Sequence, residues 1–126
     1  MDVIGFINQQ MTALGINYLF LEYKPSGKPS YPYFVGELTE EPILTEDGQE
    51  GFDLTLTGFH RGESIAPLEA DKQKIKNHFD PIYGYRAETE KGAIVIWYES
   101  AFYIPSGEAS LKKIQINLTI KSWKGD

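Results

Sequence analysis

Strict alternation of apolar and polar residues toward the C-terminal end is the feature that most constrains the fold. Ile114, Ile116, Leu118 and Ile120 are each followed by a polar residue, and the range 52–57 repeats the pattern. Successive side chains of a β-strand point to opposite faces of its sheet. The pattern therefore predicts two strands that each have one buried face and one solvated face.

Turn signals and hydrophobic periodicity divide the rest of the chain into two helices and further strands. Gly15 and Pro81 each follow an apolar repeat of helical period, so each marks the predicted end of a helix. The predicted elements are helices at 2–14 and 64–79 and strands at about 17–24, 31–44, 50–60, 83–89, 93–99 and 109–123. We expect a single α+β domain over residues 1–126, with a mostly antiparallel β-sheet, long hairpins and two α-helices packed against the sheet.

Three local patterns give finer expectations. Pro32 and Pro42 each remove a backbone donor from strand 31–44, so this strand is expected to be an edge strand or to be bulged. The run 94–96 is apolar on both faces, which is typical of a central strand covered by a helix. Ser64 precedes the second helix and is expected to cap it.

Composition narrows the class of protein. Hydrophobic residues make up 41% of the chain and aromatic residues 13%, which argues against disorder. The net charge of −6 opposes binding to phosphate backbones, and the lack of cysteine excludes disulfides, thiolate ligands and a thiol nucleophile. No apolar run reaches the roughly 18 residues of a membrane span, and the first residues lack the basic flank of a secretory signal. We therefore expect a soluble protein that folds in the cytoplasm.

The usual parts of an active site are missing from the sequence. His60 and His78 lie 18 positions apart, outside any metal-ligand spacing, and no nucleophile elbow, phosphate loop or dinucleotide fingerprint occurs. The acidic residues around the first hairpin lack the spacing of a calcium loop. They are Glu40, Glu41, Glu46, Asp47, Glu50 and Asp53. The chain is accordingly expected not to be an enzyme and to have no cofactor or catalytic metal.

Aromatic residues gather in ranges 31–34, 97–98 and 102–103, where they serve either the core or a protein interface. A second hypothesis uses them differently, as a small ligand-binding module for carbohydrates. In that hypothesis Trp97 or Trp123 forms a flat platform beside Glu99. Both interpretations remain open at this point.

Several segments resemble the small tail-completion or tail-terminator proteins of siphoviruses that infect Gram-positive hosts, in order along nearly the whole chain. They are 11–18, 31–37, 56–62 with the helix 68–79, 103–108, 111–118 and 121–123. The resemblance implies a sheet flanked by helices, and a virion structural protein without catalytic activity. It also implies a ring, commonly hexameric, that caps the tail tube, completes the tail and mediates head–tail joining.

The resemblance also implies partners and a location for this chain. The expected partners are copies of the chain itself, the major tail protein and the head-completion or connector proteins. Genome DNA is expected to pass through the ring without sequence-specific binding, along an acidic wall that includes the hairpin 40–53. The expected location is the head-proximal end of the virion tail, after folding in the host cytoplasm.

Exposed polar loops and the C-terminal tail are the segments expected to contact these partners, because such segments can become ordered on assembly. The ranges are 24–30, 45–50 and 121–126. Within them the candidate interface residues are Ser26, Gly27, Lys28, Glu46, Asp47, Gly48, Gln49, Glu50, Lys121, Trp123 and Lys124.

Overall fold

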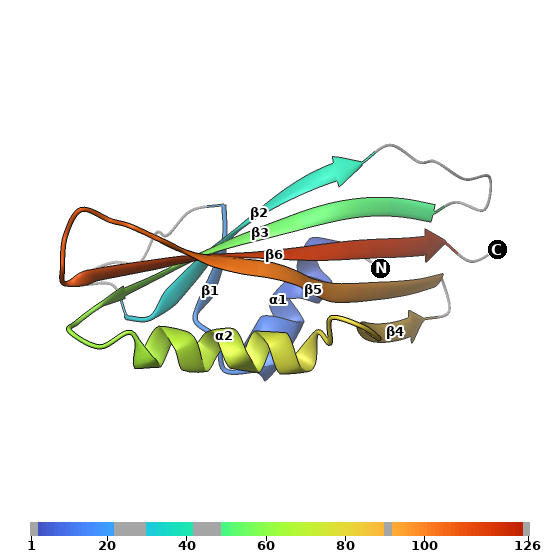
Figure 1. Cartoon of the computed structure of the whole chain (residues 1–126). Helices are drawn as coiled ribbons and strands as arrows, with labels where there is room; N and C mark the ends of the chain where they lie inside the picture. Colours follow the sequence, from blue (N-terminus) through green and yellow to red (C-terminus); the bar gives the residue numbers. More distant parts are fainter. Residues whose placement is uncertain (1–2, 22–29, 42–48, 90–91, 125–126) are drawn as a thin grey trace.

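In the residues that it describes, the computed structural model contains two helices and six strands (Figure 1). It describes residues 3–21, 30–41, 49–89 and 92–124. In chain order the elements are α1 (Val3–Ala13), β1 (Tyr18–Phe20), β2 (Tyr33–Glu41), β3 (Gln49–Arg61), α2 (Ala66–His78), β4 (Tyr85–Thr89), β5 (Gly92–Ile104) and β6 (Leu111–Lys124). The α+β class is confirmed.

The six strands form one sheet in the order β1-β2-β3-β6-β5-β4. All neighbours are antiparallel except β1 and β2, which are parallel, so the prediction of a mostly antiparallel sheet is confirmed. Two long antiparallel pairs, β2–β3 and β5–β6, are joined where β3 lies beside β6 (Figure 1). The two strands with the strictest alternation thus occupy the centre of the sheet.

Alternation in the two central strands gives the sheet a buried face and a polar face. Leu54, Leu56, Ile116 and Leu118 are 0–1% exposed, and Leu56 lies opposite Ile116 in the pairing. Side chains of the opposite parity, such as Thr55 and its partner Asn117, form the polar face. The predicted alternation is confirmed in both strands.

One cluster of buried side chains includes residues of the sheet and of both helices. From α1 it includes Ile7 and Met11, and from α2 Leu68 and Ile75, each 0% exposed. Gly58 leaves space in this cluster, because a Cβ at that position would lie 2.4 Å from Cε2 of Phe34. The missing side chain is therefore what lets the ring of Phe34 cross β3.

Several predicted boundaries are wrong. Strand 17–24 ends at Phe20, because Leu21 turns the chain with a φ of 72°, and residues 22–24 lie outside the described ranges. Strand 31–44 begins at Tyr33, and its residues 42–44 lie outside those ranges. It is not an edge strand throughout, because β1 pairs with residues 34–36.

The second half of the chain also departs from prediction. The helix 64–79 spans Ala66–His78, with Ile65 at its N-cap, and Ser64 accepts a 3.1 Å hydrogen bond from the amide of Ala66. Strand 93–99 continues to Ile104, because a bulge at Glu99 restores pairing with β6. Strand 83–89 begins two residues later, at Tyr85, and ends as predicted, whereas strand 109–123 spans Leu111–Lys124.

The run 94–96 is buried, as its composition predicts, with exposed fractions of 2%, 4% and 1%. Val95 points to the polar face, where Gly84 comes so close that a Cβ on it would lie 2.9 Å from Val95 Cγ1. The turn after α2 therefore folds over the polar face at this point. Its shape is fixed by Asp80, whose Oδ1 accepts hydrogen bonds from the amides of Ile82 and Tyr83 at 2.7 and 2.9 Å.

Candidate functional site

The polar face of the sheet carries a chain of hydrogen-bonded side chains across β3, β6 and β5. Asn117 is its centre: the Oδ1 atom accepts from Thr55 Oγ1 at 3.5 Å and from Gln115 Nε2 at 3.1 Å. Asn117 Nδ2 in turn donates to Ser100 Oγ at 3.2 Å. These residues meet because β6 pairs with β3 on one side and with β5 on the other, which places side chains of the same face next to one another. The middle of this face is therefore polar.

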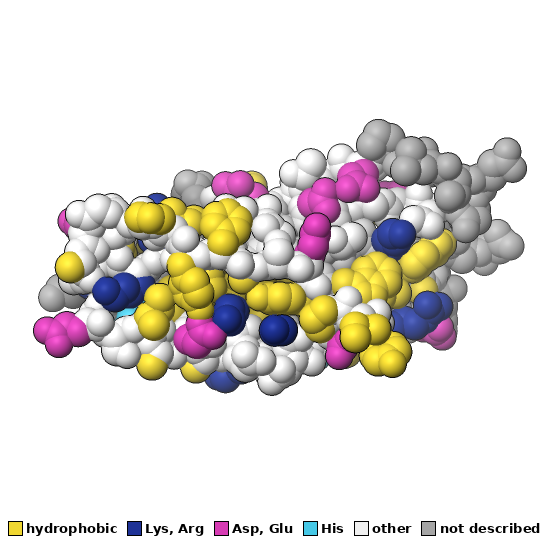
Figure 2. All heavy atoms as spheres, in the orientation of Figure 1, with side chains coloured by type: hydrophobic (Ala, Val, Ile, Leu, Met, Phe, Trp, Pro, Cys, Tyr) yellow, Lys and Arg dark blue, Asp and Glu magenta, His cyan; other side chains and the backbone are white. Residues whose placement is uncertain are grey.

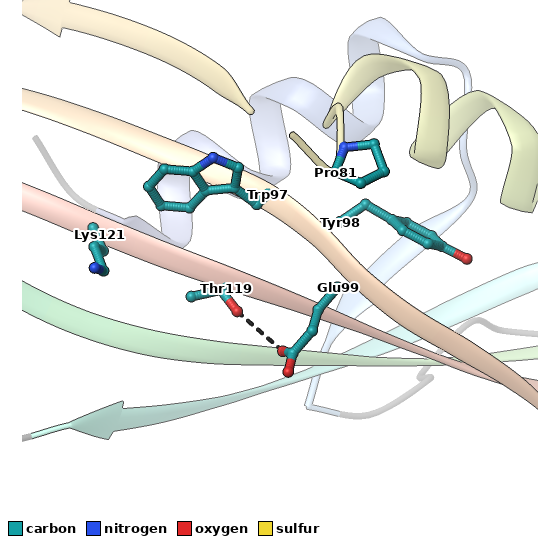
Figure 3. Close-up of a pocket in the computed structure, with 6 residues that line it drawn as sticks. All are labelled: Pro81, Trp97, Tyr98, Glu99, Thr119 and Lys121. Carbon is teal, nitrogen blue, oxygen red and sulfur yellow. Dashed lines mark hydrogen bonds between the residues drawn. The ribbon is translucent and has the colours of Figure 1, made fainter. Parts of the chain in front are cut away.

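An open cleft of about 440 Å³ lies at one end of the polar face (Figure 3). The turn after α2, β5 and β6 supply its walls, and the lining residues are Pro81, Trp97, Tyr98, Glu99, Thr119 and Lys121. Thr119 Oγ1 donates a 3.0 Å hydrogen bond to Glu99 Oε2. The cleft thus brings an indole ring, a carboxylate and an ammonium group together.

Two contacts hold the indole of Trp97 in place at this cleft. Lys121 Nζ lies 6.0 Å from the centroid of the Trp97 ring, a cation–π arrangement. Behind the ring, a Cβ on Gly84 would lie 2.8 Å from Trp97 Nε1. A larger residue at position 84 would displace the ring. The cleft is therefore suited to binding a ligand, because it places a flat apolar ring next to charged groups.

A pair of carboxylates lies next to the cleft. Asp53 and Glu41 are hydrogen-bonded, and this bond and the charge of Asp53 raise the pKa of Glu41, while Lys121 opposes the rise. Glu41 and Asp53 belong to the acidic group singled out in the sequence, and strand pairing across β2 and β3 brings these two together. In the described ranges, no group of three His, Asp or Glu side chains is arranged to hold a metal ion.

Aromatic rings cover the opposite end of the polar face. Tyr33 stacks on Phe59 with centroids 5.1 Å apart, Tyr31 lies 5.5 Å from Tyr33, and Lys113 Nζ lies 5.7 Å from the Phe59 centroid. These rings pack on one another on the surface of the sheet rather than in the buried cluster. The aromatic run that begins at Tyr31 is therefore divided, with Phe34 in the core and Tyr33 on the polar face.

The two histidines have different surroundings. His78 Nε2 lies 2.8 Å from Gln10 Oε1, and its ring stacks on Tyr85 at 4.3 Å. Burial lowers the pKa of His78, so the neutral imidazole is favoured there. His60 Nδ1 is buried and has no hydrogen-bond partner within the described ranges. Each histidine packs against an aromatic ring, His60 against Tyr31.

The structure separates the candidate interface residues into several places. Ser26, Gly27 and Lys28, like Glu46, Asp47 and Gly48, lie outside the described ranges. Gln49 lies opposite Trp123 where β3 meets β6, and Lys124 ends β6. Glu50 borders a second hollow, and Lys121 lines the cleft.

Of the predicted sugar platform, Trp97 and Glu99 come together in the cleft, whereas Trp123 lies further along β6 opposite Ala93. Pro81 and Thr119 were missed as lining residues. In the sequence Pro81 indicates a helix stop, and Thr119 is one polar position of an alternating strand. Only the pairing of β5 with β6 and the course of the turn after α2 bring them beside Trp97.

Comparison with known proteins adds no family to this description: no protein-family model matches the chain, and no curated protein matches its sequence. Neither helix of the described part has the length and apolar character needed to cross a membrane.

Proposed function

We propose that this chain is a virion structural protein that completes or terminates the tail tube of a siphovirus and takes part in head–tail joining as a ring. Its partners are copies of itself, the major tail protein and the connector proteins, and DNA passes through the ring. The sequence resemblance is the origin of this proposal. The observation that carries it is the outer edge of β5, where Phe102 and Tyr103 are 48% and 46% exposed.

An exposed apolar strand edge is unusual in a protein that acts alone. Such an edge offers unpaired backbone groups to any other chain, and proteins normally block it with charges, prolines or a covering segment. Here β4 pairs only with residues 92–96, the amide of Tyr98 donates a 2.8 Å hydrogen bond to the carbonyl oxygen of Phe79, and residues 99–104 continue beyond both contacts. We infer further that both helices cover the buried face of the sheet, so that its edges and polar face are left for contacts with other chains.

Tail tubes assembled from the major tail protein provide the test. We expect the purified chain to bind at one end of each tube, visible by electron microscopy as a terminal disc, and to stop further growth of the tube. Tubes that grow to the same lengths with and without the chain, and that carry no end density, would contradict the proposal. In the genome, the proposal predicts capsid, major tail and tape-measure genes next to the gene for this chain.

A second candidate function is carbohydrate binding, which the cleft at Trp97 favours. Sugars combine apolar C–H faces with hydroxyl groups, and the cleft sets an indole ring beside Glu99, Thr119 and Lys121. On this hypothesis, Trp97→Ala abolishes binding on a glycan array while the matched variant Trp123→Ala keeps it. An array on which the wild-type chain binds no glycan counts against this function.

A further inference from the structure

Two segments of the sheet have no strand neighbour on their outer side within the described ranges. The first, the β5 edge, is residues 99–104, which continue past the end of β4. The second, the β2 edge, is residues 37–41, which continue past the three residues paired with β1. They lie on opposite sides of the sheet, because β2 and β5 are separated by β3 and β6. One molecule therefore offers two different edges.

Aromatic rings and lysines surround the β5 edge. Tyr103 points to the buried-face side, and Lys72 Nζ lies 3.5 Å from its hydroxyl oxygen. Lys76 Nζ lies 5.7 Å from the centroid of the Tyr98 ring. Figure 2 shows hydrophobic and basic side chains next to one another along the middle of this side of the molecule, with acidic side chains among them. The β5 edge is thus apolar and has Lys76 beside it as a cation, whereas Lys72 forms a 2.6 Å ion pair with Glu69 and Glu99 lies at the start of the edge.

Acidic side chains surround the β2 edge. Glu37, Glu40 and Glu41 are all exposed. On the buried-face side of this edge lies a hollow of about 410 Å³, in which Phe20 and Leu38 form part of an apolar wall and Glu40 contributes a carboxylate. Such a hollow accepts an aromatic ring that arrives beside a cation. Its chemistry is complementary to Tyr103 with the exposed Lys76 nearby.

We propose that the β5 edge of one copy pairs with the β2 edge of the next copy, so that the sheet continues from subunit to subunit. Because β2 and β5 run in opposite directions within the sheet, a neighbour in the same orientation gives an antiparallel pair. Tyr103 then faces the hollow beside Leu38, and the lysines of α2 face Glu40. The β5 edge and the β2 edge lie toward opposite ends of the sheet, so neighbouring copies are staggered along the direction of their strands.

The partner is a second copy because both complementary surfaces belong to one chain. Two different patches that fit each other give a head-to-tail contact, which closes into a ring when the rotation between copies allows it. Pairing of β2 with β2 would bring carboxylates together, whereas pairing of β2 with β5 brings Glu40 toward Lys76, so charge favours the second arrangement. The inference rests on the proposed ring and names the surface that builds it.

Reciprocal charge reversal tests the pairing. In Lys76→Glu both edges become acidic, and in Glu40→Lys the β2 edge loses part of its acidic character and gains a cation. Alone, each variant is expected to self-associate about tenfold more weakly or worse, as measured by sedimentation velocity at high concentration and on tail tubes. Mixed in equal amounts, the two variants are expected to recover association, because the new carboxylate of the first variant can then meet the new ammonium group of the second.

Lys74→Glu and Glu63→Lys are the matched controls. They change the same charges on exposed side chains away from the two edges and are expected to associate like the wild type. Circular dichroism establishes that all variants fold. Variants that fold and still associate normally, or a mixture that does not recover, would overturn the pairing. So would a wild type that stays monomeric both in solution and on tubes.

The two proposals fail in different ways. Rings that form normally in both charge variants leave tail completion intact and refute only this interface. Rings that recover in the mixture but neither bind nor stop tail tubes confirm the interface and refute tail completion.

Discussion

Gly58 lies against the ring of Phe34, at a point of β3 where the core leaves no room for a side chain. A Cβ there would lie 2.4 Å from the Phe34 ring and 2.9 Å from Ile114 Cγ2. Both neighbours are 0% exposed, so neither can move into solvent. Gly58→Ala is therefore expected to lower the free energy of unfolding by about 1–3 kcal/mol, as overpacked cores do.

Urea denaturation measures this effect, and Thr57→Ala is the control from the polar face of the same strand. The control is expected to change stability by less than about 1 kcal/mol, because it leaves the core unchanged. Equal losses in the two variants would show that the space at Gly58 is not constrained by Phe34.

His78 is expected to make the folding stability of the protein fall as the pH falls. Because burial holds its pKa below the ordinary value of 6.5, the unfolded chain takes up the proton first as the pH falls. The contribution of neutral His78 to stability is fully present above pH 6.5 and is lost as the pH falls toward the folded pKa. His78→Gln is expected to remove this part of the pH dependence.

The measurement is Tm at pH 7.5 and pH 5 for both proteins. The wild type is expected to lose more Tm on acidification than His78→Gln does. If both lose the same amount, protonation of His78 is not linked to folding.

At the scale of single residues, the sequence predicted which face of the sheet a side chain occupies better than it predicted which side chains lie next to one another. It showed that Leu54 and Ile116 face the core and Asp53 does not, because alternation is a local property. It did not show that Glu41 is hydrogen-bonded to Asp53, because that requires the pairing of β2 with β3.

At the scale of elements, β6 and β4 differ most in how they are held. β6 lies between β3 and β5 along nearly its whole length and carries four side chains that are 0% exposed. β4 pairs with β5 alone, over five residues. We expect amide hydrogen exchange to be slowest in β6 and β3 and fastest in β4 and β1, because local opening is easiest where few contacts must break. Protection in β4 equal to that in β6 would contradict this order.

The sequence predicted the existence of most elements but not their ends. The helices were expected from apolar spacing, and α2 begins two residues later than predicted, at Ala66. The extension of β5 to Ile104 was missed because the bulge at Glu99 shifts the alternation, so that Ala101 and Tyr103, and not Phe102, follow Tyr98 on the buried-face side. A pattern of period two has no way to anticipate such a shift.

At the scale of the whole molecule, two long strand pairs are joined through β3 and β6 into one sheet. This joining was not predictable, because β3 and β6 show the same alternation whichever strand lies beside them. It nevertheless decides the function that we propose: it leaves β2 and β5 near opposite margins of the sheet, with acidic side chains beside one and lysines beside the other. The complementarity is a property of the folded chain and of no single segment.

Cryo-electron microscopy of the chain bound at the end of a tail tube tests the central claim most directly. Our account predicts a closed ring in which β5 of each subunit hydrogen-bonds with β2 of the next, and Tyr103 enters the hollow beside Leu38. A monomer at the tube end, or a ring in which both edges face solvent, would contradict it.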